Sequence, residues 1–119
     1  MGQCYSVRLR MKPKDETRFV RESRKYATDN GWPLGYRREM CSVDGVVKAV
    51  TSDSNISISD DGGWVKVVVD FNAPYYWEGV LCEWFSTVAC MLEDGSEIEV
   101  LPDKGKWKYV VREGVAVCA

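Results

Sequence analysis

The clearest pattern of hydrophobic and polar positions lies in residues 74–92, PYYWEGVLCEWFSTVACML. Asn72 is placed to cap a helix here, Pro74 suits its first turn, and Asp94-Gly95 supplies its end. The large apolar residues recur at intervals of three and four, which places them on one helical face. They are Trp77, Val80, Leu81, Trp84, Phe85, Val88, Met91 and Leu92. The spacing therefore predicts a helix whose aromatic stripe packs on a sheet.

The first thirty residues contain two other patterns. Residues 3–11 alternate between apolar and polar side chains, which predicts a half-buried strand. Asp15 is placed to cap a helix that reaches Asn30, followed by Gly31 as a stop. The expected buried positions are Tyr5, Val7, Leu9 and Met11 in the strand, and Phe19, Val20, Ser23, Tyr26 and Ala27 in the helix.

Residues 31–55 are open to two interpretations. The segment begins with Gly-Trp-Pro-Leu-Gly, which is expected to break any helix. After it, valines 43, 46, 47 and 50 have helical spacing behind a possible cap at Ser42. Asp44-Gly45 between valines is equally a hairpin turn signal. The pattern slightly favours a short helix.

Two hairpins are expected in the remaining chain. Residues 56–59 and 64–71 flank the turn Asp60-Asp61-Gly62-Gly63, and residues 96–101 and 106–112 flank residues 102–105. In the second hairpin, pairing Leu101 with Lys106 places Val100 opposite Trp107, Ile98 opposite Tyr109, and Glu99 opposite Lys108 on the other face. Residues 115–118 are expected to add an edge strand.

The predicted order is strand, helix, uncertain segment, strand, strand, helix, strand, strand. It contains a βαββαβ arrangement and resembles the ferredoxin-like α+β sandwiches. The resemblance implies a mainly antiparallel sheet covered on one face by two helices, with extra C-terminal strands. A chain of 119 residues fits one domain. The resemblance implies no function, because that fold hosts many unrelated activities.

Composition removes several classes of chemistry. The chain has no histidine, so Ser-His and Cys-His nucleophiles and the commonest metal ligand are excluded. Its five cysteines form no C-x-x-C pair, which favours free thiols in a cytoplasmic protein over a disulfide framework or a zinc site. Glu78 and Glu83 interrupt the apolar run of residues 74–92, so no transmembrane segment is expected. No cofactor and no metal are predicted.

Charge is distributed unevenly along the chain. Residues 1–41 carry ten Lys or Arg against five acids, and residues 42–119 carry six against thirteen. The first strand and helix supply a candidate basic patch for phosphates or an acidic protein. Its residues are Arg8, Arg10, Arg18, Arg21, Arg24 and Lys25, with Lys12 and Lys14 between them. The alternative is a solvated surface, and Trp64 and Phe71 do not fit the RNP pattern of sequence-specific RNA recognition.

Three weaker candidates remain. Trp32, Tyr75 and Tyr76 flank predicted helix ends, where aromatic residues either border the core or make binding contacts. Residues 60–63 are interpreted as a turn, because they lack the ligand spacing of an EF-hand and the lysine of a P-loop. The start, MGQCYS, also fits a myristoylation pattern with Cys4 placed for palmitoylation, although the same residues open the first strand.

Together these patterns favour a small cytoplasmic, non-catalytic binding or regulatory protein that acts through a macromolecular contact surface. Phages and mobile elements frequently encode small domains of this kind. The alternative is a small enzyme or ligand-binding domain that uses carboxylates such as Asp60, Asp61 or Asp70. That alternative requires a deep pocket containing a carboxyl group with a shifted pKa.

Overall fold

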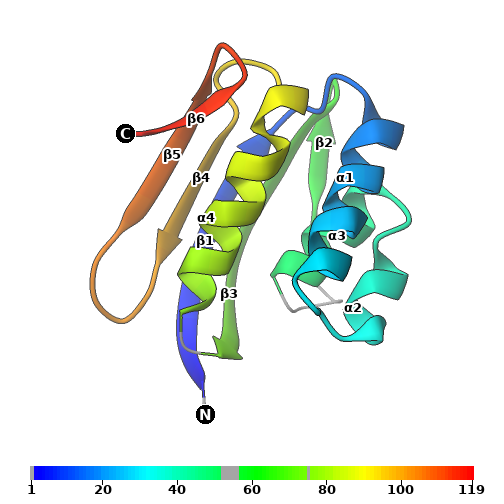
Figure 1. Cartoon of the computed structure of the whole chain (residues 1–119). Helices are drawn as coiled ribbons and strands as arrows, with labels where there is room; N and C mark the ends of the chain where they lie inside the picture. The colour runs from blue at the N-terminus through cyan, green and yellow to red at the C-terminus, as the bar shows by residue number, and fades with distance from the viewer. Residues whose placement is uncertain (1, 52–56, 75) are drawn as a thin grey trace.

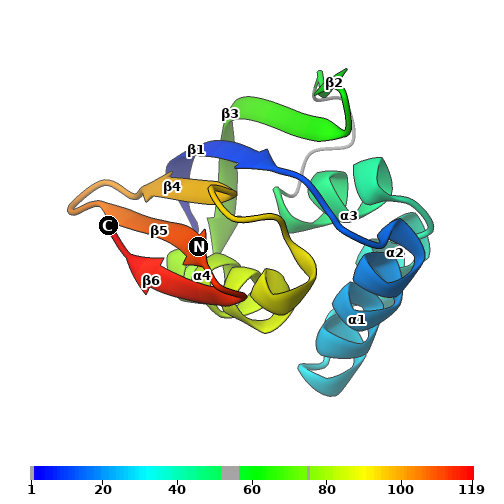
Figure 2. The same cartoon turned by 90° about the horizontal axis from the view of Figure 1, so that it is seen from above.

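The computed structural model describes residues 2–51, 57–74 and 76–119. In these ranges, six strands form one antiparallel sheet in the order β2-β3-β1-β4-β5-β6, and the helices lie on one side of it (Figures 1 and 2). The strands are β1 (Gly2–Met11), β2 (Ser59–Asp61), β3 (Trp64–Pro74), β4 (Glu97–Leu101), β5 (Trp107–Arg112) and β6 (Val115–Cys118). The helices are α1 (Glu16–Asp29), α2 (Leu34–Glu39), α3 (Val43–Val50) and α4 (Trp77–Val88), with the 3-10 turn η1 (Ala89–Met91) after α4. The predicted α+β class is confirmed.

The predicted first strand, β1, lies near the middle of the sheet. It pairs with β3, where Tyr5 lies opposite Phe71, and with β4, where Val7 lies opposite Val100. Successive side chains of a strand point to opposite faces, so paired positions place their side chains on the same face. The buried residues of this inner face are Tyr5, Val7, Leu9, Met11, Val65, Val67, Phe71, Ala73, Ile98 and Val100. They meet the buried faces of the helices in one hydrophobic core.

The aromatic stripe of α4 is confirmed, but the start of the helix is not where the sequence predicts it. Trp84 and Phe85 are fully buried. Asn72 and Pro74 belong to β3, because this strand continues to the pair Gly2 and Pro74. The helix begins at Trp77, after the left-handed residue Tyr76, and Asn72 does not cap it. No helix within the described ranges is both long and apolar enough to cross a bilayer.

The N-caps predicted for α1 and α3 are both present. The side chain of Asp15 accepts a hydrogen bond from the backbone N–H of Arg18, and that of Ser42 accepts one from Gly45. The preference for a short helix at residues 43–50 is therefore confirmed over the hairpin. Helix α2 was not predicted: it starts at Leu34, directly after Pro33, inside the segment expected to break any helix. Proline is tolerated there because the first helical N–H groups need no intrahelical partner.

The register predicted for the second hairpin is confirmed for Ile98 with Tyr109, Glu99 with Lys108, and Val100 with Trp107. The predicted pair Leu101 with Lys106 is not part of the ladder, because β5 begins at Trp107. The edge strand β6 is also present. In the first hairpin the turn is shorter than predicted. Asp60 and Asp61 belong to β2, and Gly62 and Gly63 alone make the turn with positive φ values of 61° and 87°, as a two-residue type I′ turn requires.

The helical layer is larger than the predicted pair of helices. In the described ranges three α-helices separate β1 from β2, and α4 separates β3 from β4. Strands β5 and β6 extend the sheet beyond β4, as expected for extra C-terminal strands. The ferredoxin-like arrangement itself stays a prediction. Residues 52–56 lie outside the described residues, and with them part of the predicted strand at 56–59.

Candidate contact surface

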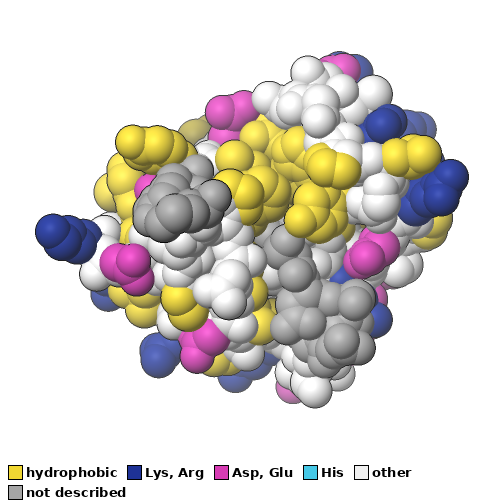
Figure 3. Space-filling model, turned by 90° about the horizontal axis from the view of Figure 1, so that it is seen from below, with side chains coloured by type: hydrophobic (Ala, Val, Ile, Leu, Met, Phe, Trp, Pro, Cys, Tyr) yellow, Lys and Arg dark blue, Asp and Glu magenta, His cyan; other side chains and the backbone are white. Residues whose placement is uncertain are grey.

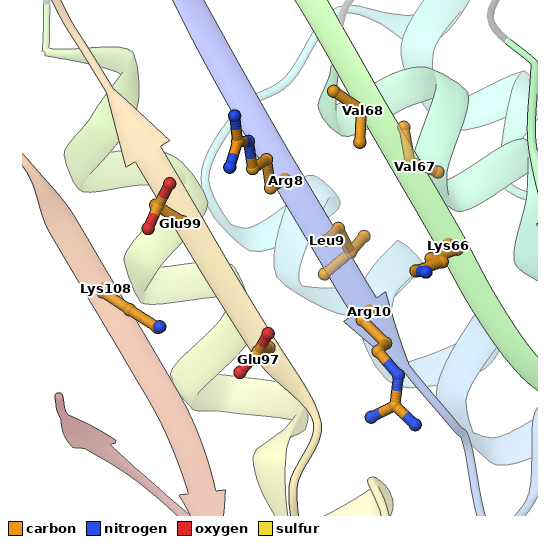
Figure 4. A pocket seen from close by; sticks show the side chains of 9 residues that line it. All are labelled: Arg8, Leu9, Arg10, Lys66, Val67, Val68, Glu97, Glu99 and Lys108. Atoms are coloured by element: carbon orange, nitrogen blue, oxygen red, sulfur yellow. The ribbon is translucent and has the colours of Figure 1, made fainter.

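The face of the sheet that points away from the helices carries charged side chains on four neighbouring strands. We call this side the open face. In Figure 4 it is turned toward the viewer, and the helices lie behind the strands. Arg8 and Arg10 project from β1 between the buried residues of the inner face. The labelled side chains from the neighbouring strands are Lys66 and Val68 on β3, Glu97 and Glu99 on β4, and Lys108 on β5.

Strand register places these side chains in two rows that run across the sheet. The first, here the Arg8 row, is Val68, Arg8, Glu99 and Lys108. The second, the Arg10 row, is Lys66, Arg10, Glu97 and Val110. In each row the arginine of β1 is directly followed by the glutamate of β4. At the β1/β4 boundary, both rows therefore have an arginine on the β1 side and a glutamate on the β4 side.

The two rows enclose a shallow hollow of about 220 Å³. Its walls include the seven labelled open-face side chains of β1, β3, β4 and β5 (Figure 4). Pockets that hold small molecules usually have about 300–1,000 Å³ and enclose most of the ligand. The hollow is smaller than that range and open to solvent. It fits a few side chains of a partner better than an enclosed ligand.

The cations of the open face are largely without carboxylate partners. Among the described residues, the ion pairs at salt-bridge distance are Lys25 with Asp29 and Lys106 with Glu99. Arg8, Arg10, Lys66 and Lys108 take part in neither pair. Arg10 is nevertheless held in place, because its guanidinium carbon lies 3.9 Å from the centroid of the Trp64 ring. Such a contact orders the side chain and leaves its N–H groups available to an anion.

Apolar side chains flank these charges on the same face. Val68 is 74% exposed and lies between the hollow and a second depression beside β2. At the other end of the sheet, Val115 and Val117 of β6 are 59% and 40% exposed. Val117 pairs with Val110, which shares the face of Glu97, so these valines also belong to the open face. The surface thus combines a charged centre with apolar ends, as many protein contact surfaces do.

The basic patch predicted from the first strand and helix is divided between two surfaces. Arg8 and Arg10 lie on the open face, whereas α1 lies on the helical side of the sheet (Figure 2). Arg18, Arg21 and Arg24 are exposed on α1, together with Lys25, which pairs with Asp29 at 3.2 Å. The structure therefore does not bring all of these residues together in one patch. Alternating side chains point to opposite faces of a strand, and α1 covers the face that Arg8 and Arg10 do not occupy.

The two described residues of the predicted aromatic margin differ: Trp32 belongs to the core, whereas Tyr76 is exposed. Trp32 is 7% exposed, and its ring packs against Tyr26, Tyr36 and Trp77 with centroids 5.3–6.2 Å away. Hydrophobic side chains gather at this end of the molecule, seen from below in Figure 3. Tyr76 is 80% exposed beside it, and Tyr75 lies outside the described residues.

The carboxylates of the enzymatic alternative are not gathered in one site. Asp60 accepts a hydrogen bond from the N–H of Gly63 and so serves the turn, while Asp70 accepts one from the hydroxyl of Ser6. Both side chains are exposed, as is Asp61. In the part of the chain that the structure describes, no group of three Asp, Glu, Cys or His is placed to hold a metal ion.

Raised pKa values occur under the helices and not in the hollow. Burial, followed by the nearby carboxylate of Glu83, raises the pKa of Tyr26 to about 12. Burial, followed by the charges of Glu78 and Cys118, raises the pKa of the Cys82 thiol to about 11. Burial also raises the pKa of Tyr5 and of Tyr109. These shifts mark core packing and do not point to an acid or base facing a substrate.

Sequence reasoning missed Lys66, Glu97 and Lys108 as members of a surface with Arg8 and Arg10. The signal was nevertheless present, because Lys66 lies between two buried residues of its strand and Lys108 was expected opposite Glu99 on the outer face. What was missing was the order of strands, which brings β3, β1, β4 and β5 together.

Gly2 and Cys4, the residues of the lipidation pattern, lie in β1. Compared with known proteins, the chain matches no protein-family model, no curated protein and no solved structure.

Proposed function

We propose that this chain is a small binding protein that contacts another macromolecule through the open face of its sheet. In this proposal Arg8 and Arg10 meet acidic groups of the partner, and Lys66 and Lys108 lie beside them on the same face. The observation that carries the proposal is the presence of these four cations on a face that no helix covers in the described part of the chain, none of them held by a carboxylate. Exposed charges that already have partners contribute little to binding, whereas free ones are available to it.

The ordered state of Arg10 adds to this support. A flexible arginine loses side-chain entropy when it binds, at a cost of about 0.5–1.5 kcal/mol for an immobilised side chain. Contact with Trp64 restricts Arg10 before any partner arrives, which reduces that cost. The exposed valines at the two ends of the face provide apolar contacts around the charged centre. A macromolecule can cover both ends at once, whereas a small ligand in the central hollow cannot.

The carboxylate enzyme remains the alternative, but no observation favours it. Its three candidate aspartates are exposed, two of them accept hydrogen bonds from Gly63 and Ser6, and the hollow on the open face is shallow. A non-catalytic role therefore has the better support. We also propose a cytoplasmic location, for which the support is that all five cysteines are free thiols.

A ferredoxin-like core is the finer structural proposal. Its support is the antiparallel pairing of β1 with both β3 and β4, together with α1 after β1 and α4 after β3. In this interpretation β5 and β6 are additions to one edge of the sheet.

The binding proposal is tested with the double variant Arg8→Glu/Arg10→Glu. Wild-type and variant proteins are immobilised and exposed to lysate of the native host, with and without nuclease treatment, and the retained molecules are identified and their affinities measured with purified material. We expect the double variant to lose the partner, by at least about a hundredfold in Kd if two contacts are reversed. The matched control is Arg18→Glu/Arg21→Glu on α1, which makes the same charge change and should retain the partner.

The opposite pattern, loss of the partner in the α1 variant and retention in the β1 variant, would place binding on the helical side and overturn the proposal. Retention by both variants would overturn it as well. Thermal unfolding of each variant shows whether the fold has survived, since exposed substitutions usually change stability by less than about 0.5 kcal/mol.

A further inference from the structure

We propose that the partner of the open face is a second copy of this chain, packed face to face about a two-fold axis that runs along the strands between β1 and β4. This inference rests on the proposed function, because it uses the open face as the contact surface. It identifies the acidic groups that meet Arg8 and Arg10 as Glu99 and Glu97 of the second copy. The resulting dimer is isologous, so each such contact occurs twice.

The order of strands gives the open face the symmetry that this arrangement needs. In the described residues, three strands (β2, β3, β1) lie on one side of the β1/β4 boundary and three (β4, β5, β6) on the other. A two-fold axis along this boundary places β1 opposite β4 of the second copy and β3 opposite β5. It also places β2 opposite β6. Every strand of the face then has a facing strand, and the covered part of β1 is the stretch Ser6–Arg10, where it pairs with β4.

The Arg8 row is complementary to itself when it is turned about that axis. Arg8 meets Glu99 of the second copy, and Val68 meets the side chain of Lys108. Lysine side chains carry a long apolar stem, so the contact with Val68 removes apolar surface from water while the ammonium group reaches the rim. Within each copy Lys106 already pairs with Glu99 at 3.3 Å, so we expect the contact of Arg8 with Glu99 to contribute less than that of Arg10 with Glu97.

The Arg10 row behaves in the same way. Arg10 meets Glu97 of the second copy, and Lys66 meets Val110. Neither row places two charges of the same sign opposite each other. Opposition of like charges costs several kcal/mol at an interface, so this pattern is a requirement that a self-associating surface has to satisfy. The two rows satisfy this requirement because the charge changes from positive on β1 to negative on β4 in both of them.

The dimensions of the face also fit. Packed sheets lie about 10 Å apart, a gap that one arginine and one glutamate span together. Six strands about 4.8 Å apart give a face roughly 24 Å wide, and the five residues over which β1 pairs with β4, Ser6–Arg10, give a length of roughly 17 Å. The product is roughly 400 Å² for each copy, which is the size of a weak or transient contact. Charged pairs dominate its centre, so we expect a weak, salt-sensitive dimer.

Nucleic acid fits the same surface less well. Glu97 and Glu99 stand among the cations and repel phosphates, while the ring face of Trp64 that would stack on a base is occupied by Arg10. The exposed valines at the ends of the face have no use in holding a phosphate backbone. A second protein surface satisfies both the charges and the valines. Binding of nucleic acid is therefore kept as an outcome of the test.

The test is a charge exchange between Arg10 and Glu97. Sedimentation equilibrium of the full chain at several concentrations and salt levels should show a monomer–dimer equilibrium for the wild type. Arg10→Glu places two pairs of carboxylates together and Glu97→Arg places two pairs of arginines together, so each variant alone should dimerise at least about tenfold more weakly. An equimolar mixture of the two variants should recover the dimer, because both contacts of the mixed dimer then join opposite charges.

Arg21→Glu on α1 is the matched control, since it makes the same charge change outside the face and should leave the equilibrium unaltered. Circular dichroism and thermal unfolding show that each variant is folded. If a variant fails this check, the exchange of Arg8 and Glu99 provides the same test with other residues. A wild type that is monomeric at every concentration would overturn the inference. The inference would also be overturned if the substitutions left the dimer dissociation constant unchanged, or if the mixture of the two variants did not recover the dimer.

The outcomes separate this inference from the proposed function. A monomeric chain that still loses a lysate partner in the Arg8→Glu/Arg10→Glu variant would leave the open face as a contact surface and reject the second copy. If that partner disappears after nuclease treatment, it is nucleic acid, which also rejects the second copy. A dimer that is recovered by the charge exchange supports both statements.

Discussion

The indole nitrogen of Trp84 donates a 3.0 Å hydrogen bond to the hydroxyl oxygen of Ser23, and neither residue is accessible to solvent. This contact joins α4 to α1 across the helical layer. Replacing Ser23 with alanine leaves the buried N–H without a partner, at an expected cost of about 1–3 kcal/mol in the free energy of unfolding. Urea denaturation measures the loss, with Ser86→Ala on the exposed face of α4 as the control. Equal stability of the two variants would show that the hydrogen bond contributes nothing.

Trp84 itself is the largest fully buried side chain, and its ring contacts Phe19 and Phe85 at centroid distances of 6.1 Å and 6.4 Å. Trp84→Ala removes these contacts and leaves a cavity, so we expect a loss of about 3–5 kcal/mol. For a small domain this is a large share of the total stability. An unchanged thermal midpoint would contradict the central place of α4 in the core.

A third prediction concerns Gly45 in α3. A Cβ atom added there would lie 1.8 Å from the carbonyl oxygen of Glu39, so the backbone around the α2–α3 junction would have to move. We expect Gly45→Ala to lower the free energy of unfolding by about 3 kcal/mol, the upper end of the usual overpacking range. Gly35→Ala in α2 is the matched control, because its added Cβ meets nothing within 4 Å. Similar thermal midpoints for the two variants would argue against this close approach.

The five cysteines should fall into two groups in a thiol titration. Cys4, Cys41, Cys90 and Cys118 are exposed, whereas Cys82 is buried in α4 and its thiol pKa is raised to about 11. The thiolate is the reactive form, so four thiols should react rapidly with a coloured disulfide reagent in the native protein and the fifth only on unfolding. Cys82→Ser should remove the slow phase alone. A count below five in denaturant without reductant would reveal a disulfide.

Stability should fall at alkaline pH because of buried tyrosines. The pKa of Tyr26 in the folded protein is about 12, above its usual value of 10.0. The unfolded chain therefore releases its proton first, so the contribution of this residue is complete below pH 10 and is lost as the pH rises toward 12. The free energy of unfolding, measured in urea across this interval, should decline less steeply in Tyr26→Phe. An identical slope in both proteins would contradict the assigned pKa.

Elements set by local pattern were predictable from the sequence. The side chains of Asp15 and Ser42 cap the helices that follow them, and the four-residue link 102–105 fixes Val100 opposite Trp107. Long-range pairing was not predictable. Asn72 has the right chemistry for an N-cap, but the pairing of Pro74 with Gly2 extends β3 past it. Helix α2 was missed because it has only six residues, none of them buried, and begins directly after Pro33 in a segment rich in turn-forming residues.

The same limit applies to the candidate site. Arg8 and Arg10 were correctly placed opposite the buried face of β1, and Arg18, Arg21 and Arg24 on the outer face of α1. Their separation depends on which face of the sheet α1 covers, and that is decided by the matching of Phe19, Ser23 and Tyr26 with α4 and the inner face. The partners of Arg10 on the open face, Lys66 and Glu97, are 56 and 87 positions away in the sequence. Strand order, a property of the whole fold, brings them together.

The position of β1 between β3 and β4 has a consequence for how the protein is made. β1 leaves the ribosome before the other strands of this sheet, yet Tyr5 can pair only after Phe71 has been made, and Val7 only after Val100. Closing such long loops before any contact is gained slows folding. During synthesis one edge of the alternating strand at residues 2–11 therefore stays free until β3 has emerged and the other until β4 has emerged, and free edges are where chains aggregate. The arginines that alternate along this strand keep it charged throughout that interval.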